Sequence, residues 1–218
     1  MRDAVIFDMD GLMLDTERIA KWTFIESCAD FNLSFDEAVY ASCVGSNLTR
    51  TADILETHFT DFKRKAFMSR WNEKYVENAI LKPVPVKKGV KEFLTYLAER
   101  GIRCAVASST PEVNALRKLE NAGLLDFFNA LAFGDQVTNS KPHPEIYQLA
   151  ASRLDIRADH CAALEDSDNG VRAAVSAKML VFQVPDLIAP SVDVLSLGHQ
   201  VVPSVAHVHK HFLDPSNS

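Results

Sequence analysis

Five short apolar runs recur along the chain, and they constrain its fold more than any other feature. They are AVIF (4–7), CAVAS (104–108), ALAFG (130–134), CAALE (161–165) and LVFQV (180–184). Each run is almost continuously apolar, which is typical of strands covered on both faces in a parallel sheet. Between them, segments such as VKEFLTYLAERG and EIYQLAASRL carry apolar residues at helical spacing. The alternation predicts an α/β fold built on a doubly wound parallel sheet.

One long segment interrupts this alternation. Residues 17 to about 80 contain only helical patterns, such as RIAKWTFIESCADF. They are followed by LKPVPVKKG (81–89), whose prolines and glycine are typical of a connection that returns to the sheet. We therefore expect two domains. Residues 1–15 and 82–218 form the core, and residues 16–81 form a helical domain inserted after the first strand.

Composition excludes several classes of protein. The net charge of −6 argues against nucleic acid or an anionic membrane as a partner. No apolar run approaches the roughly 18 residues of a membrane span, and aspartates interrupt the N-terminal stretch that a signal peptide would need. The four cysteines are widely spaced, which argues against zinc and disulfides. We expect a cytoplasmic protein, and the sequence predicts no oligomeric state.

The first apolar run ends in two carboxylates. Asp8 follows the run directly, and ligands of open α/β sheets bind beyond the carboxyl ends of the strands. A carboxylate there can attack phosphorus and form an acyl phosphate. Asp10 returns to the same side of an extended chain, where it can act as general acid and then as general base. The alternative is that the pair only caps a helix or forms a turn.

Hydroxyl groups end the second run. Ser108, Ser109 and Thr110 are followed by Pro111, and proline after threonine signals the start of a helix. Backbone N–H groups at that helix start would then point at the same crevice, and hydroxyls and helix N-termini both bind phosphate. An ordinary helix cap is the alternative.

The remaining strand ends supply charge. Lys141 is followed by a Pro-His-Pro segment that fixes the chain, which makes it a candidate counter-charge for phosphate, although most lysines are solvated surface residues. Glu165 and Asp166 end the fourth run, and adjacent acids are costly there unless they are neutralised. With Asp8 and Asp10 they carry up to four negative charges, of which Lys141 offsets one. The sequence therefore predicts a divalent cation, and the oxygen donors favour Mg²⁺.

In this order and spacing, FDMDG, VASST, SKPHP and LEDSDNG resemble the four motifs of the haloacid dehalogenase superfamily of phosphotransferases. The helical insert resembles the type-1 cap of that superfamily, and DMDGLMLDTE with LEDS resembles its β-phosphoglucomutase-like branch. The resemblance extends over roughly residues 4–190. It implies a Rossmann-like core with a helical cap, and it implies that Asp8 is the nucleophile and Asp10 the acid/base.

The resemblance also implies a ligand set. Mg²⁺ would be held by the Asp8 carboxylate, the backbone carbonyl of Asp10 and the Asp166 carboxylate, with Glu165 in or next to the coordination shell. A second set would bind the transferred phosphoryl group, and its members are Ser108, Lys141 and the backbone of Ser109.

Residues of the inserted segment bear on the substrate. Thr16 matches the mutase members, but this chain has Ala20 where they carry a histidine, and Trp71 near the position of their cap lysine. Both differences favour a phosphatase over a mutase. The loop CVGSNLTR supplies Gly45 and Arg50 as further candidates, although an ordinary turn with a surface arginine explains them as well. Candidate substrate contacts are therefore Thr16, Gly45, Arg50 and Trp71.

These observations predict a Mg²⁺-dependent phosphatase of small phosphorylated metabolites, with sugar phosphates as the favoured substrates. A β-phosphoglucomutase-like phosphomutase is the first alternative. A catalytically idle protein that binds phosphorylated metabolites is the second, and the intact set of acidic and basic motif residues argues against it, because binding alone needs no proton shuttle.

Overall fold

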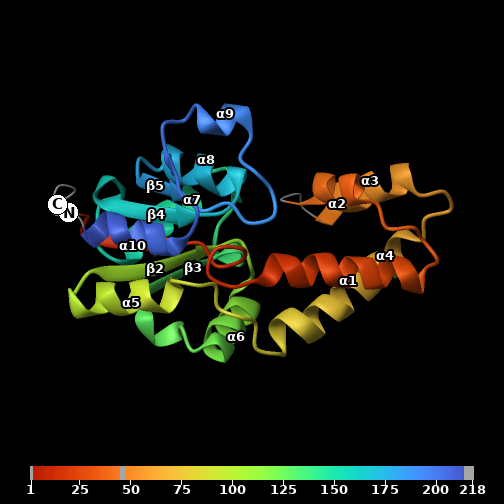
Figure 1. Cartoon of the computed structure of the whole chain (residues 1–218), viewed down its shortest axis with the longest axis horizontal. Coiled ribbons are helices and arrows are strands. Elements are labelled where there is room, and N and C mark those ends of the chain that lie inside the picture. Colours follow the sequence, from red (N-terminus) through yellow and green to blue (C-terminus); the bar gives the residue numbers. More distant parts are fainter. Residues whose placement is uncertain (1, 45–47, 214–218) are drawn as a thin grey trace. The chain divides into compact units, whose positions relative to one another are not determined.

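The computed structural model describes residues 2–44 and 48–213 and forms two compact units (Figure 1). The core unit comprises Met1–Asp15 and Val84–Ser218, and the helical unit comprises Thr16–Pro83. The return to the core is predicted at residue 82, and in the structure the core resumes at Val84. The backbone N–H of Asp15 donates a hydrogen bond to the carbonyl of Pro85 over 3.0 Å. The chain thus leaves the core and re-enters it at neighbouring points.

The core unit is built on one six-stranded sheet in which every pair is parallel, in the order β3-β2-β1-β4-β5-β6. The strands are β1 (Ala4–Phe7), β2 (Arg103–Ser108), β3 (Ala130–Phe133), β4 (Cys161–Glu165), β5 (Leu180–Gln183) and β6 (Gln200–Val201). The predicted fold class is confirmed, because all five apolar runs form strands. The sixth strand was not predicted, since Gln200 and Val201 are exposed and follow no apolar run.

The strand order reverses at β1. This strand lies between β2 and β4, with Ala4 opposite both Arg103 and Cys161. Connections from β1 to β2 and from β3 to β4 therefore diverge to opposite sides, and such a switch point leaves a crevice at the carboxyl ends of the strands. The ends of β1, β2 and β4 meet there, which brings the predicted motifs together from distant parts of the sequence.

Helices cover both faces of the sheet (Figure 1). They are α5 (Val90–Glu99), α6 (Glu112–Ala122), α7 (Glu145–Arg153), α8 (Asp168–Ser176) and α10 (Val205–Leu213), and the short α9 (Val192–Leu195) packs against α8. Successive strand residues point to opposite faces. Ile6 belongs to an apolar cluster with residues of α7 and α8, whereas Phe7 packs edge-on against Phe93 of α5, with ring centroids 5.9 Å apart. On the Phe7 side, Phe182 of β5 contacts Phe212 of α10.

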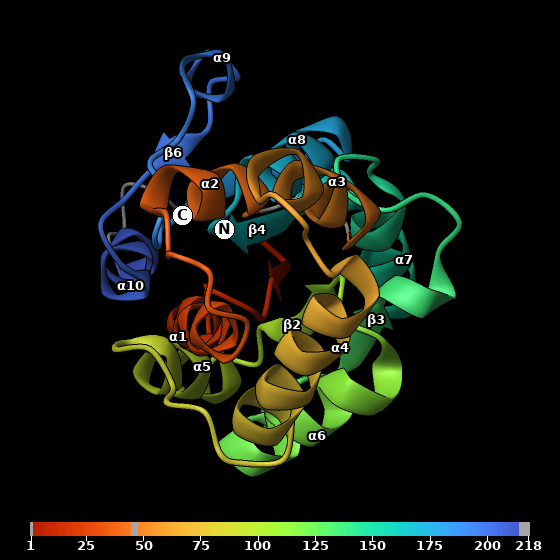
Figure 2. The ribbon, with the colours of Figure 1, turned by 90° about the vertical axis from the view of Figure 1, so that its right-hand side faces the viewer.

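The helical unit has its own aromatic core. Its helices are α1 (Thr16–Asp30), α2 (Glu37–Cys43), α3 (Leu48–His58) and α4 (Arg64–Tyr75), and a π-helical turn (Val76–Ile80) continues α4. Helix α1 packs against α4, and α2 against α3 (Figure 2). Phe24 of α1 lies at the centre, with its ring 5.6 Å from that of Phe67 and 5.1 Å from that of Trp71. Aromatic contacts therefore hold this unit together independently of the sheet.

All four cysteines are free and buried. Burial raises the pKa of the Cys28 thiol to about 11 and that of Cys104 to about 12, so these thiols stay protonated and are poor nucleophiles. Among the described residues, no helix is both long enough and apolar enough to cross a bilayer.

Candidate active site

The turn after β1 fixes the two motif aspartates. The backbone N–H of Asp8 continues the β1–β4 ladder by donating to Leu164, so Asp8 begins where the strand ends. Gly11 has a φ of 80°, a conformation that glycine adopts without a steric cost and that tightens the turn. The Lys87 ammonium donates to the carbonyl of Gly11 over 2.6 Å and pairs with Asp186. The loop that carries Asp8 and Asp10 is therefore held from within the core.

Lys141 is bound by three acceptors. Its ammonium donates to Asp8 Oδ1 over 2.6 Å, to Glu165 Oε1 over 2.5 Å and to the backbone carbonyl of Ala107 over 3.0 Å. The side chain is buried, and its charge lies 5.0 Å from the centre of the Tyr147 ring. The ends of β1, β2 and β4 thus share one cation.

The Glu165 carboxylate is completely buried and saturated with donors. Its Oε1 atom accepts from Lys141 and from the Tyr147 hydroxyl, the latter over 2.9 Å. Its Oε2 atom accepts from the backbone N–H groups of Asp166 and Ser167 and from the Ser167 hydroxyl, all between 3.0 and 3.1 Å. A buried anion with five donors is a structural anchor. It fixes both Lys141 and the turn that presents Asp166.

Burial and neighbouring charges shift the pKa values of Asp8 and Lys141. Burial raises the pKa of the Asp8 carboxyl, Lys141 acts in the opposite direction, and the nearby Glu165 and Asp10 carboxylates add to the rise. Burial lowers the pKa of Lys141, but the Asp8 and Glu165 carboxylates outweigh it, so the pKa of this lysine is raised. Lys141 therefore remains a cation, and Asp8 needs further positive charge to be a good nucleophile.

Three carboxylates fit a hard metal ion. One oxygen atom from each of Asp8, Glu165 and Asp166 lies within 4.8 Å of the others. Carboxylate oxygens are the donors that Mg²⁺ prefers. Because Glu165 already accepts five hydrogen bonds, Asp8 and Asp166 are the members of this group better suited to ligation. The donor set therefore fits the predicted cation, and it would supply the positive charge that Asp8 lacks.

The end of β2 presents hydroxyl groups and backbone. Ser108 is buried, and its hydroxyl oxygen accepts a hydrogen bond from the N–H of Thr110 over 3.1 Å. The exposed Ser109 is held through its backbone, because a β-carbon at Gly134 would lie 2.1 Å from the Ser109 carbonyl oxygen. Glycine at position 134 therefore allows the β3 end to press against Ser109. Both serines follow Ala107 in the chain, and the Ala107 carbonyl accepts a hydrogen bond from Lys141.

The predicted helix start after β2 was wrong by one residue. Helix α6 begins at Glu112, and Pro111 is the residue before its first turn. The N–H of Glu112 donates to the Asp135 carboxylate rather than toward a phosphate. Thr110 does not cap the helix, because its hydroxyl donates to Asp10 Oδ2 over 2.7 Å. Thr110 thus contributes to the site by contacting Asp10.

Sequence reasoning missed Lys118. This lysine of α6 is 1% exposed, and its ammonium lies 2.7 Å from Asp10 Oδ1. A signal was present, because Lys118 occupies the buried face of α6 with Ala115, Leu119 and Ala122. A charged residue on the apolar face of a helix requires a buried partner.

The candidate substrate contacts belong to the helical unit. Thr16 is the buried first residue of α1, and Arg50 lies on the exposed side of α3. Trp71 packs into the aromatic core of this unit, and its indole N–H donates to the Ala20 carbonyl and to the Thr23 hydroxyl, each over 3.2 Å. Gly45 lies outside the described residues.

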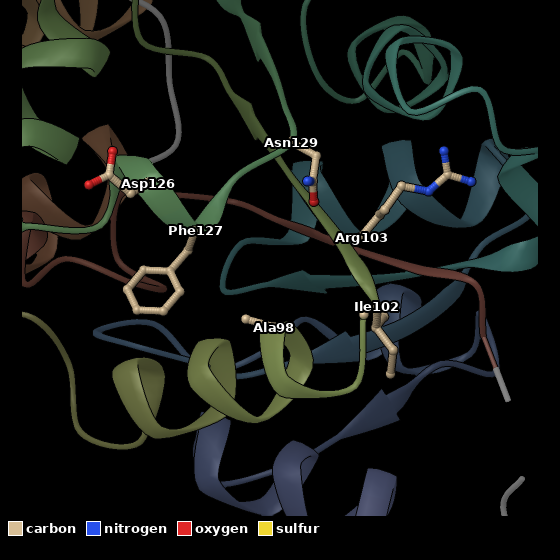
Figure 3. A pocket seen from close by; sticks show the side chains of 7 residues that line it. Ala98, Ile102, Arg103, Asp126, Phe127 and Asn129 are labelled. Atoms are coloured by element: carbon tan, nitrogen blue, oxygen red, sulfur yellow. The ribbon is translucent and has the colours of Figure 1, made fainter.

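A separate pocket lies at the end of the strands opposite to Asp8 and Lys141, and Figure 3 shows the residues that line it. It has a volume of about 380 Å³ and is lined by Ala98, Gly101, Ile102, Arg103, Asp126, Phe127 and Asn129. Arg103 begins β2, and Asn129 precedes β3. The pocket is therefore at the amino ends of the strands, whereas Asp8 and the Lys141 ammonium lie at the carboxyl ends.

Comparison with known proteins agrees with this geometry. Residues 5–184, from the start of β1 to just beyond β5, match the family of haloacid dehalogenase-like hydrolases. The chain belongs to this family. The resemblance noted from the motifs is confirmed.

Individual relatives are phosphatases and a mutase. The phosphorylated carbohydrates phosphatase of Thermotoga maritima is 34% identical over 80% of this chain and 81% of that protein. The β-phosphoglucomutase of Bacillus subtilis is 28% identical over 83% of this chain and 82% of that protein. A crystal structure of a haloacid dehalogenase-family hydrolase from Deinococcus radiodurans with bound phosphate and sodium has a TM-score of 0.83, 25% identity, and coverage of 97% and 95%. The family and the named phosphatases among these relatives support phosphatase activity for this chain.

Proposed function

We propose that this haloacid dehalogenase-like hydrolase cleaves phosphate monoesters of small metabolites, above all sugar phosphates, through a phosphoaspartate on Asp8. The observation that carries the proposal is the buried Asp8 carboxylate held 2.6 Å from the Lys141 ammonium at the switch point of the sheet. Such a pair places a nucleophile next to a fixed positive charge, which is what a phosphoryl group requires. The carbohydrate phosphatase of Thermotoga maritima supports the substrate class.

The reaction has two steps with one proton transfer in each. An Asp8 oxygen attacks phosphorus, the bond from phosphorus to the ester oxygen breaks, and Asp10 gives its proton to that oxygen. Water then attacks the phosphoaspartate, Asp10 takes a proton from it, and phosphate and free Asp8 result. Lys141 and Ser108 hold oxygens of the phosphoryl group through both steps, assisted by the backbone N–H of Ser109.

The metal would be held by the Asp8 and Asp166 carboxylates and by the backbone carbonyl of Asp10, with Glu165 beside them as the anchor of Lys141. When bound, Mg²⁺ supplies charge neutralisation for the phosphoryl group and the nucleophile. Once Asp10 has given up its proton, the four carboxylates carry four negative charges, and Lys141 and Lys118 contribute two positive ones. A divalent cation therefore balances the acidic residues of the site.

We assign substrate selection to the helical unit as a cap, with Thr16, Gly45, Arg50 and Trp71 as the candidate contacts. The indole N–H of Trp71 already donates to Ala20 and Thr23 of the helical unit. A contribution of Trp71 to substrate binding would therefore come from the face or edge of its ring. Ala20 offers no polar group to a second phosphate. The cap therefore favours monophosphates over the bisphosphates that a mutase must hold.

A phosphomutase is the second candidate, and the similarity to β-phosphoglucomutase favours it. In a mutase the phosphoaspartate outlives the reorientation of the substrate, whereas in a phosphatase Asp10 activates water on it at once. We therefore expect release of phosphate over many turnovers from hexose or pentose monophosphates, with no need of a bisphosphate activator.

The deciding assay incubates the enzyme with glucose 1-phosphate, with and without a bisphosphate, and measures free phosphate against isomerised sugar phosphate. A panel of other sugar phosphates, scored by released phosphate, identifies the preferred substrate. Isomerisation that exceeds release by tenfold, a barrier difference of about 1.4 kcal/mol, would assign the chain to the mutases.

A further inference from the structure

Each of the two motif aspartates has its own buried lysine. Lys141 forms a salt bridge with Asp8. Lys118 of α6 forms one with Asp10, and its ammonium lies 2.7 Å from Oδ1. We propose that Lys118 is a positioning residue that orients the Asp10 carboxylate for proton transfer. The proposal rests on the function proposed above, in which Asp10 is the acid and the base.

Burial makes the pairing of Lys118 obligatory. The side chain is 1% exposed, although a lysine ammonium strongly favours water. An unpaired buried ammonium would strongly destabilise the fold. An apolar residue would fill the same place among Ala115, Leu119 and Ala122 without that penalty. The lysine is therefore explained by its carboxylate partner rather than by packing.

Two donors fix the orientation of the Asp10 carboxylate. Lys118 binds Oδ1, and the Thr110 hydroxyl binds Oδ2 over 2.7 Å. Both donors come from the β2 end and the helix that follows it, and the start of α6 is in turn held by the hydrogen bond from Glu112 to Asp135. A carboxylate held at both oxygens cannot rotate freely about its terminal bond. Because proton transfer depends on geometry before it depends on acidity, this restraint bears directly on the rate.

The first experiment replaces Lys118 with Met, which keeps the length and removes the charge. We expect the turnover number on a sugar phosphate to fall by about 100-fold or more, because leaving-group protonation is worth that much, while KM changes little. p-Nitrophenyl phosphate needs no proton donor, because nitrophenolate leaves as a stable anion. Rapid mixing of Lys118→Met with this ester should therefore give a burst of about one nitrophenolate per active site, at nearly the wild-type rate. Slow turnover should follow, since hydrolysis of the phosphoaspartate still needs Asp10.

Matched variants separate orientation from stability. Arg117→Met removes a positive charge from an exposed neighbour on the same helix and should keep full activity. Lys118→Arg keeps the charge and should recover part of the lost turnover. In an Asp10→Asn background, Lys118→Met should lower turnover by no more than about threefold, because residues that act through one another are non-additive.

The outcomes separate the possible explanations. If Lys118 had a purely structural role, Lys118→Met would lower the burst rate and the rate on sugar phosphate by the same factor. Its effect on turnover would also multiply with that of Asp10→Asn. Either result would overturn the proposal. If Lys118→Met does not fold, as judged by circular dichroism, Lys118→Leu carries the same test, because it also removes the donor and the charge. Failure of the wild-type enzyme to release phosphate from either ester would refute the proposed function instead. In that case a crystal structure of the Lys118 variant with an unmoved Asp10 side chain would refute the positioning role.

Discussion

Gly170 lies against the carboxylate of Glu165 so closely that a β-carbon on Gly170 would come within 1.7 Å of Oε1. Gly170 belongs to the first turn of α8, and its N–H donates to the Ser167 hydroxyl, which itself donates to Glu165. The Glu165 side chain cannot move aside without giving up several of its five hydrogen bonds. A glycine outside the reacting groups therefore controls the position of Lys141.

Gly170→Ala should displace Glu165 and loosen Lys141. We expect the free energy of unfolding to fall by about 1–3 kcal/mol, the usual effect of overpacking, and phosphatase activity to fall more than stability alone explains. Urea unfolding and phosphate release measure the two effects. The control is Ser176→Ala on the exposed side of the same helix, which should change neither. An unchanged Gly170→Ala variant would contradict the role of Glu165 as an anchor.

Asp8→Asn should abolish turnover while the protein stays folded, because the substitution keeps the shape of the side chain and removes the attacking charge. We expect a loss of about three orders of magnitude or more in turnover number. Rapid quenching of the wild-type enzyme during turnover, followed by mass spectrometry of its peptides, should place the phosphoryl group on Asp8. Phosphate trapped on another residue would refute this assignment.

Removal of divalent cations should stop the reaction. Asp8, Asp10, Glu165 and Asp166 outnumber the two buried lysines, so chelation leaves the site too negative to accept a phosphate ester. Added Mg²⁺ should restore full activity. Ca²⁺ should inhibit, because its larger and looser shell admits bidentate ligation that would occupy the nucleophile. Undiminished phosphate release in excess chelator would contradict the prediction.

Stability should decrease in mild acid through His199. Burial lowers the pKa of this histidine, and its Nδ1 atom has no hydrogen-bond partner among the described residues, while Nε2 lies 2.7 Å from Gln183 Oε1. The folded state therefore favours the neutral ring. This contribution is complete above the unfolded pKa of about 6.5 and is lost as the pH falls below it. Urea unfolding at several pH values should show a shallower dependence between pH 7 and 5 in His199→Gln, and equal slopes would contradict the argument.

The sheet was predictable because its signal is local. The runs at β1 and β4 are continuous apolar segments, so their position and their polar ends could be read without knowledge of the rest of the chain. Strand β6 has no such signal. Gln200 and Val201 are exposed, and they are extended only because Gln200 pairs with Phe182 of β5.

The active site was only partly predictable, for the same reason. Asp8 follows β1 and Lys141 lies between β3 and α7, so the order of strands and helices was enough to predict that they lie close together. Lys118 lies on a helix 108 positions from Asp10, and only the folded chain brings them together. Glu165 is a second example. Its carboxylate accepts hydrogen bonds from Tyr147 and from the turn between β4 and α8, and these contacts depend on packing that the sequence alone does not reveal. Distant pairing of buried charges is thus the part of the site that motifs do not reveal.

The hydrogen bond between Asp15 and Pro85 has a consequence for how such enzymes diversify. Because the inserted unit begins and ends at neighbouring points, it can be exchanged for a segment of different length without altering the register between β1 and β2. With substrate selection assigned to the helical unit, as proposed above, recombination at these two points would transfer substrate preference as one module. The same hydrolytic machinery could then be offered a new metabolite in a single genetic event.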